Sequence, residues 1–278
     1  MLFIINPISG KGKKKKITQM LLDRGHKVAC TEYAGHGEIL AREASEKTIV
    51  AVGGDGTVNE VARGLIGSDK TLGIIPCGSG DGLARHLGLS HNIEKAIKTI
   101  EQGKAMDMDA ALVNDRVFIS VCGVGFDAVV SERFALCGKR GLWNYIKQGL
   151  KTWRTYEPES YTVTIDGEAI ETKALFITIG NSDQWGNNAR ITPLADCSDG
   201  LLEVTIVNKF SSIELPWLGL KLMTGRIHKS RHVTYLHGKE ITIVRNSAGP
   251  AHADGDWFTT GNSLVVKIIP KALKIIIP

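Results

Sequence analysis

The chain has 278 residues, of which 43% are hydrophobic and 23% charged, and these values exclude an intrinsically disordered or collagen-like protein. No apolar run approaches the length of a transmembrane helix. Lys and Arg exceed Asp and Glu by 34 to 29, which is too small an excess to indicate nucleic-acid binding but suits an anionic ligand or membrane surface. The five cysteines form no Cys-x-x-Cys pair, and the segment Met1–Ile5 is unlike a secretory signal, so we expect a cytoplasmic protein. The length of the chain indicates two domains.

The first 110 residues alternate short apolar runs with helical patterns. Glycines follow two of the predicted helices, at Gly25 and Gly67, where helices commonly end. The predicted strands are 2–5, 28–30, 49–52 and 72–75, and the predicted helices are 14–24, 37–46, 57–66 and 92–102. This alternation predicts an α/β domain with a parallel sheet over residues 1–110.

Residues 111–278 show a different pattern, with many short strand-like runs separated by turn signals such as Asp166-Gly167. The predicted strands are 117–122, 161–166, 174–180, 201–207, 232–236, 240–245 and 264–269, and helical stretches interrupt them at 128–155 and 212–223. The pattern predicts a β-rich domain with an antiparallel sandwich.

The strongest local signal is Gly53-Gly54-Asp55-Gly56-Thr57, which follows a buried strand and opens a helix. Glycines let the backbone approach a phosphate, and the helix N-terminus supplies N–H donors. Asp55 then stands where a carboxylate could deprotonate a hydroxyl or hold a magnesium ion. The alternative is a tight turn in which Asp55 and Thr57 only cap the helix.

Two further loops follow strands of the same predicted sheet. Asn6-Pro7-Ile8-Ser9-Gly10-Lys11 follows the first strand, and Pro76-Cys77-Gly78-Ser79-Gly80-Asp81-Gly82 follows the fourth. The carboxyl ends of parallel strands share one edge of a sheet, where ligands bind. We therefore expect all three loops to contribute to one site.

These motifs, in this order, resemble those of the diacylglycerol kinase catalytic-domain family, which includes bacterial lipid kinases, sphingosine kinases and ceramide kinases. Gly123–Ala128, Pro193–Leu202 and Asp254-Gly255 also resemble family elements, so the similarity extends along most of the chain. The resemblance implies an ATP-binding domain at 1–110, a lipid-substrate domain at 111–278 and a cleft between them.

The resemblance also implies roles for individual residues. Asp196, Asp199 and the carbonyl of Leu201 would hold a structural Mg²⁺ ion, although the same residues could form a plain Asx turn. A second Mg²⁺ ion would accompany the ATP phosphates. The residues implied in ATP binding are Asn6, Pro7, Ser9, Gly10, Lys11, Thr31, Gly53, Gly54, Asp55, Gly56, Thr57, Asn59, Ser79 and Asp256.

Asp55 and Asp254 compete for the role of general base, because different branches of the family favour one or the other. The alternative for Asp254-Gly255 is a hairpin turn. Two positions depart from the family pattern. Asp256 replaces a glutamate, and Asp81 replaces an asparagine, which adds negative charge near the expected phosphates.

The resulting hypothesis is an ATP- and Mg²⁺-dependent lipid kinase, peripheral to the membrane, that phosphorylates a hydroxyl of diacylglycerol or a related lipid. The alternatives are a sphingoid-base or ceramide kinase, an NAD kinase, and a non-catalytic nucleotide or lipid sensor. No nucleic-acid partner is expected, and the sequence leaves a homodimer open. A final set of residues suits either a membrane interface or, more commonly, a core: Trp143, Tyr145, Trp153, Trp217, Leu218 and Leu220.

Overall fold

The computed structural model describes residues 1–7, 14–138 and 142–278. The chain divides into two compact units, of which unit 1 contains Met1–Asp109 and Pro270–Pro278, and unit 2 contains Ala110–Ile269. The C-terminal residues Pro270–Pro278 thus belong with the N-terminal part, whereas the expected division placed them with the second domain. The reason is strand pairing, since Lys274 and Ile275 align with Thr71 and Leu72 in a parallel register.

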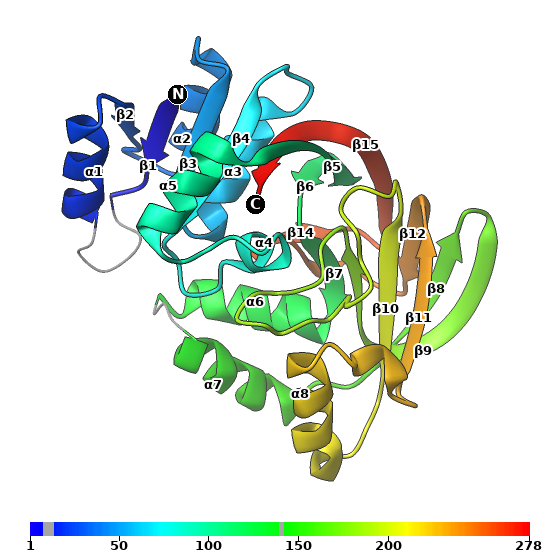
Figure 1. Ribbon diagram of the computed structural model, residues 1–278. Helices are drawn as coiled ribbons and strands as arrows, with labels where there is room; N and C mark the ends of the chain where they lie inside the picture. Colours follow the sequence, from blue (N-terminus) through cyan, green and yellow to red (C-terminus); the bar gives the residue numbers. More distant parts are fainter. Residues whose placement is uncertain (8–13, 139–141) are drawn as a thin grey trace. The chain divides into compact units, whose positions relative to one another are not determined.

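Unit 1 alternates strands and helices (Figure 1). Its elements are β1 (Leu2–Ile5), α1 (Lys14–Asp23), β2 (Lys27–Cys30), α2 (His36–Glu43), β3 (Thr48–Gly53), α3 (Asp55–Leu65), β4 (Thr71–Pro76), α4 (Gly82–His86), α5 (Ile93–Gln102), the start of β5 (Lys104–Val113) and the end of β15 (Ser263–Ile277).

The sheet of unit 1 is parallel, with β1 between β2 and β3 and with β4 between β3 and the end of β15. Side chains of alternate strand residues pack with α1 and α5 on one face, and α3 contacts β3 and β4. Phe3, Val50 and Ile17 lie in the core of the first of these faces and are almost fully buried. The chain adds β2 on one side of β1 and then crosses to add β3 and β4 on the other side. Open α/β sheets bind ligands at this change in strand order, here between β1 and β3.

Unit 2 is dominated by strands (Figure 1). Its elements are the end of β5, β6 (Arg116–Phe118), β7 (Val121–Gly125), α6 (Phe126–Leu136), α7 (Leu142–Trp153), β8 (Glu159–Ile165), β9 (Glu168–Gly180), β10 (Leu202–Asn208), the 3-10 helix η1 (Ser212–Glu214), α8 (Leu215–Met223), the 3-10 helix η2 (Ile227–Lys229), β11 (Val233–Gly238), β12 (Glu240–Arg245), β13 (Gly249–Ala253), β14 (Asp256–Thr260) and the start of β15.

The strands of unit 2 pair antiparallel. The long strand β9 pairs with β8 along its first half and with both β7 and β10 along its second half. Further pairs join β7 to β13, β13 to β14, β10 to β11, and β12 to β8 and β15. Their inward side chains form one apolar core that includes Phe118, Val163 and Ile243. The predicted combination of a parallel α/β part and an antiparallel β-rich part is therefore confirmed.

Several predicted elements differ in their bounds. The helical stretch expected at 128–155 contains two helices, because α6 ends at Leu136 and Gly138 adopts a positive φ of 66°. The strand expected at 117–122 is divided between β6 and β7. The hairpin β13–β14 lies in a segment for which no strand was predicted. Gly249 and Pro250 give β13 a low strand propensity, whereas Trp257, Phe258 and the threonines of β14 favour a strand that the sequence analysis missed. None of the helices in the described ranges is both long and apolar enough to span a bilayer.

Candidate functional site

The ends of four parallel strands bring the predicted nucleotide loops together in unit 1. Asn6 follows β1, and its N–H points to the carbonyl of Val52 on β3 at 3.4 Å. Thr31 follows β2 and donates its N–H to the carbonyl of Ile5 at 2.9 Å. Because these strands are parallel and in register, the residues that follow them lie along the same sheet edge.

The two glycine-rich loops touch through their backbones. Cys77 donates its N–H to the carbonyl of Gly53 at 2.7 Å. A Cβ atom added at Gly54 would lie 3.1 Å from the Cα of Gly78, and one added at Gly78 would lie 2.7 Å from the Cα of Gly54. A side chain at position 78 would therefore overlap the backbone of the other loop, and one at position 54 would be a tight fit. The helix α3 begins at Asp55 without a capping side chain. Its N–H groups suit a phosphate.

Asp55 and Asp81 form an acidic pair where these loops meet. Asp55 accepts a hydrogen bond from the N–H of Gly82 at 2.7 Å, and Asp81 accepts one from the N–H of Gly78 at 3.0 Å. Burial raises the pKa of Asp55. Burial, followed by the charge of Asp55, raises the pKa of Asp81 to about 6. The residue that departs from the family pattern is thus 2% exposed and carries its charge beside the predicted phosphate loop.

Replacing Asp81 with asparagine is expected to stabilise the protein above pH 6. Between the ordinary carboxyl pKa of 3.8 and about 6, the folded protein binds more protons than the unfolded chain, so stability falls as the pH rises. Asparagine removes this dependence, and it tolerates the left-handed φ of 46° at this position. We expect a gain of about 1–3 kcal/mol at pH 7.5, measured by urea unfolding. An equal or smaller unfolding free energy at that pH would contradict the assignment.

Three further residues around these loops were not assigned roles from the sequence. Glu60 accepts hydrogen bonds from the N–H groups of Gly35 and Gly37 at 2.9 and 3.0 Å, and so fixes the loop that follows Thr31. Arg85 donates to the carbonyl of Gly80 at 2.9 Å, and its charge lowers the pKa of both acids. His91 Nε2 lies 3.2 Å from Asp81 Oδ2, an ion-pair distance without the alignment of a hydrogen bond.

In unit 2, Asp254 and Gly255 form a two-residue hairpin turn between β13 and β14. Both have a positive φ, 51° and 86°, which is typical of a type I′ turn. The carboxylate of Asp254 accepts three hydrogen bonds at 2.8–3.1 Å, from the backbone N–H groups of Ile119, Ser120 and Val121. The turn interpretation is thus correct in geometry, and the same geometry holds the carboxylate in one orientation.

A buried polar cluster lies beside this hairpin. His252 Nε2 is 3.1 Å from Asp127 Oδ2, and each of these two side chains is 3% exposed. Thr178 donates its hydroxyl to the same Asp127 oxygen at 3.0 Å. Among the described residues His252 Nδ1 has no hydrogen-bond partner. The cluster joins β13, β9 and the start of α6, and it explains why glycine is needed at position 123, where a Cβ would lie 2.5 Å from Asp127 Oδ2.

Substituting Gly123 with alanine is expected to destabilise the protein by about 1–3 kcal/mol, as overpacking of a core does. The added methyl group would also lie 2.9 Å from the carbonyl oxygen of Ile177, which belongs to the sheet and cannot rotate away. Gly149, in α7, is the matched control because nothing lies within 4 Å of an added Cβ there. Its alanine variant should be neutral or slightly more stable. Urea unfolding of both variants measures the difference, and equal stabilities would refute the steric explanation.

The predicted magnesium loop is a series of turns in unit 2. Asp196 Oδ1 accepts hydrogen bonds from the N–H and hydroxyl of Ser198, and Asp199 Oδ1 accepts one from the N–H of Leu201. Both aspartates are exposed. Within the described residues, no group of three or more His, Cys, Asp or Glu side chains is arranged to hold a metal ion. Two carboxylates and one carbonyl are nevertheless hard oxygen donors, and Mg²⁺ commonly completes such a set with water.

Other predicted residues lie as follows. Thr57 and Asn59 are buried on α3, whereas Pro7, Ser79 and Asp256 are exposed. Ser9, Gly10 and Lys11 are outside the described residues.

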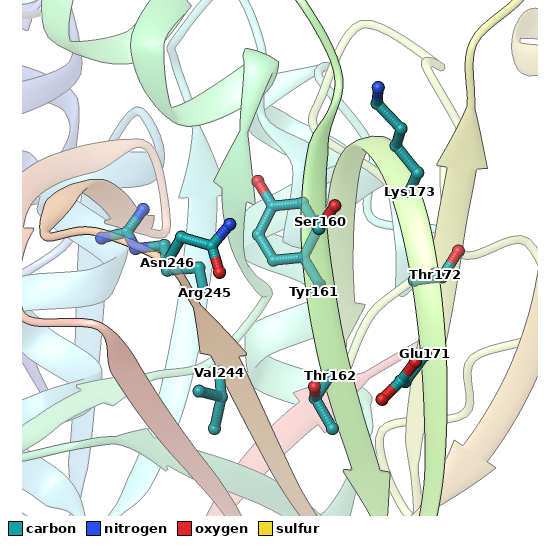
Figure 2. Close-up of a pocket in the computed structure, with 9 residues that line it drawn as sticks. All are labelled: Ser160, Tyr161, Thr162, Glu171, Thr172, Lys173, Val244, Arg245 and Asn246. Atoms are coloured by element: carbon teal, nitrogen blue, oxygen red, sulfur yellow. The ribbon is translucent and has the colours of Figure 1, made fainter.

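Figure 2 shows a pocket of about 460 Å³ over β8, β9 and β12 of unit 2. No residue predicted for ATP, magnesium or catalysis lines it. Arg245, one of the residues that line the pocket, donates hydrogen bonds from its guanidinium group to the backbone carbonyls of Gly249 and Pro250, at 2.6 and 3.0 Å. Its polar walls, including Glu171 and Lys173, are unlike the apolar lining that an acyl chain requires.

Comparison with known proteins agrees with this arrangement of motifs. Residues 1–113 match the family model "Diacylglycerol kinase catalytic domain", and residues 120–277 match "YegS C-terminal NAD kinase beta sandwich-like domain". A relative named "Probable lipid kinase YegS-like", from Chromohalobacter salexigens, is 32% identical over 84% of this chain and 79% of its own length. A relative named "Diacylglycerol kinase", from Bacillus subtilis, is 26% identical over 91% of this chain and 88% of its own length.

The fold is also similar to a solved structure of a diacylglycerol kinase from Bacillus anthracis str. Sterne. The TM-score is 0.76 and the identity 22%, with 100% of this chain and 96% of that chain covered. Together, the two family models account for nearly the whole chain in the order of its two units. The chain therefore belongs to the kinase family in which a diacylglycerol kinase catalytic domain is followed by a YegS-type C-terminal domain, and it is a lipid kinase of that family.

Proposed function

We propose that the protein transfers the γ-phosphate of ATP, with Mg²⁺, to a hydroxyl group of diacylglycerol or a closely related lipid. The observation that carries the proposal is the meeting of the Gly53–Thr57 and Gly78–Gly82 loops at the carboxyl edge of a parallel sheet. The match of residues 1–113 to a diacylglycerol kinase catalytic domain supports the choice of acceptor.

In this proposal the nucleotide binds at the sheet edge of unit 1. The N-terminus of α3 would face the phosphates, and the backbone around Gly54 and Gly78 would lie close to them because no side chain intervenes. Asn6, Thr31 and Ser79 complete the predicted contacts. Phosphoryl transfer depends mainly on such positioning and on neutralisation of charge.

Magnesium would be held by Asp196, Asp199 and the carbonyl of Leu201, and a second ion would bind with the ATP phosphates. When bound, the ion accompanying ATP supplies positive charge that offsets the developing negative charge on the transferred group. A carboxylate of the chain, Asp55 or Asp254, accepts the proton of the lipid hydroxyl. Asp256 follows Asp254 after the turn and is proposed to support the nucleotide.

The test is a phosphorylation assay of purified protein with radiolabelled ATP and Mg²⁺. Mixed micelles of diacylglycerol, monoacylglycerol, sphingosine and ceramide are the acceptors, and NAD is a further acceptor in a parallel reaction. Labelled phosphatidic acid is the expected product. Labelled sphingosine phosphate or ceramide phosphate would identify the protein as a sphingoid-base or ceramide kinase instead. Labelled NAD without labelled lipid would refute lipid phosphorylation, and ATP binding without any labelled product would favour a sensor.

A second candidate, a sphingoid-base or ceramide kinase, has one specific observation in its favour. The loop Gly78-Ser79-Gly80, followed by Leu83-Ala84, is more similar to the corresponding element of sphingosine and ceramide kinases than to that of bacterial diacylglycerol kinases. The same assay decides between the two acceptors.

A further inference from the structure

The helices of unit 2 expose large apolar side chains in two regular stripes. On α7, Trp143, Ile146 and Leu150 are exposed at a spacing of three and four residues, which places them on one helix face. On η1 and α8, the exposed residues Ile213, Trp217, Leu220 and Met223 follow the same spacing. Trp143 is 83% exposed and Trp217 is 68% exposed. We call these seven residues the docking face.

Both helices are already anchored through other side chains. Leu218 and Leu222 of α8 pack into a cluster with Phe176 and Ile227, and Trp153 at the end of α7 packs against the same cluster. Trp153 donates its Nε1–H to the hydroxyl of Ser212 at 3.0 Å, so the end of α7 and the start of the η1–α8 segment are in contact. The docking face is therefore not needed to hold these helices to unit 2.

The charges around the docking face are predominantly positive. Residues 142–156 contain three Lys and Arg residues and no Asp or Glu, and residues 213–234 contain four and one acidic residue, Glu214, so each segment has a net charge of +3. Glu214 is paired with Arg231 and His232. The whole chain has a net charge of only +5, so these two segments carry more positive charge than the complete protein. Lys147 and Lys151 lie next to the apolar stripe of α7, and Lys221 lies within that of α8.

We propose that the docking face binds an anionic lipid bilayer, with Trp143 and Trp217 entering the interface and the flanking lysines and arginines meeting the head groups. Tryptophan beside long basic side chains is typical of helices that lie in a membrane interface. Lysine, in contrast, is depleted in interfaces between proteins, so a second copy of this chain fits the surface less well. The inference rests on the proposed function, because a diacylglycerol acceptor must be taken from a bilayer.

The prediction is tested by co-sedimentation of the full chain with sucrose-loaded vesicles of phosphatidylcholine, with and without phosphatidylserine. Binding should be at least about tenfold stronger with phosphatidylserine and should weaken as salt is added. The double variant Trp143→Ala/Trp217→Ala should lower the vesicle partition coefficient at least about tenfold. The matched control is Leu22→Ala/Ile39→Ala, which removes two exposed apolar side chains from unit 1 and should bind like the unmodified protein.

A second measurement separates this inference from the proposed function. Phosphorylation of a short-chain, water-soluble diacylglycerol should have the same kcat in the tryptophan double variant as in the unmodified protein. If the unmodified protein turns over this substrate but does not bind vesicles, the docking face alone is refuted. If the unmodified protein binds vesicles but forms no lipid product, the proposed function alone is refuted. A dimer that the tryptophan substitutions convert to a monomer, seen by sedimentation velocity without vesicle binding, would overturn the inference in favour of self-association.

Discussion

Replacement of Asp254 with asparagine is expected to lower kcat about 100- to 10,000-fold in a protein that remains folded. Asn-Gly is a preferred pair for a type I′ turn, so the β13–β14 hairpin should keep its shape. The amide has only one acceptor oxygen for the three N–H donors of Ile119, Ser120 and Val121. We therefore also expect a loss of about 1–3 kcal/mol in stability.

Asp166 provides a matched control for the structural part of this effect. Asp166-Gly167 forms the same two-residue turn, between β8 and β9, with φ values of 48° and 96°. Its carboxylate also accepts hydrogen bonds from backbone N–H groups, those of Lys239 and Glu240. Asp166→Asn should lower stability but leave kcat unchanged. If both variants keep full activity, Asp254 has no catalytic role.

Because the proposed general base is Asp55 or Asp254, at least one of the two asparagine variants must lose activity. If the base is Asp55, its replacement with asparagine lowers kcat by a similar factor, about 100- to 10,000-fold. Asp55 begins α3 beside both glycine loops, and asparagine can still accept the hydrogen bond from the N–H of Gly82. Far-ultraviolet circular dichroism and urea unfolding should show a folded protein. A kcat within a few-fold of that of the unmodified protein would remove Asp55 from the mechanism.

The pH dependence of kcat distinguishes the two carboxylates. A general base must be ionised, so activity falls as the pH drops through its pKa. Burial raises the pKa of Asp55, so if Asp55 is the base, activity should fall at a higher pH than for an ordinary carboxyl group. This fall should then be absent from the residual activity of Asp55→Asn and present in that of Asp254→Asn. The reverse result would identify Asp254 as the base.

Much of unit 1 could be predicted from the sequence because its signals are local. The apolar runs at β3 and β4 and the glycine loops that follow them are each continuous in the chain. Because β3 and β4 are neighbouring parallel strands, the loops that follow them lie side by side, and this brings Gly54 and Gly78 together. The family resemblance rests on the same continuous motifs.

The hydrogen-bonded contacts of the catalytic candidates depend on tertiary structure. Asp254 is held by residues more than a hundred positions earlier, and His252 meets Asp127 across a comparable separation. Neither contact leaves a periodic signal in the sequence. The acidic pair of Asp55 and Asp81 likewise depends on tertiary structure. The sequence shows that both residues are acidic, but their raised pKa values result from burial in the folded chain.

The α/β and β-rich parts, the glycine loops and the candidate carboxylates could be predicted from residue type and short-range spacing. Three other features depend on contacts between distant segments of the folded chain: the pairing of Pro270–Pro278 with unit 1, the anchoring of Asp254, and which tryptophans are exposed. Trp153 and Leu218 pack inward, whereas Trp143 and Trp217 face outward. An apolar residue on an amphipathic helix is buried or exposed according to what packs against that helix, and this is a property of the folded chain.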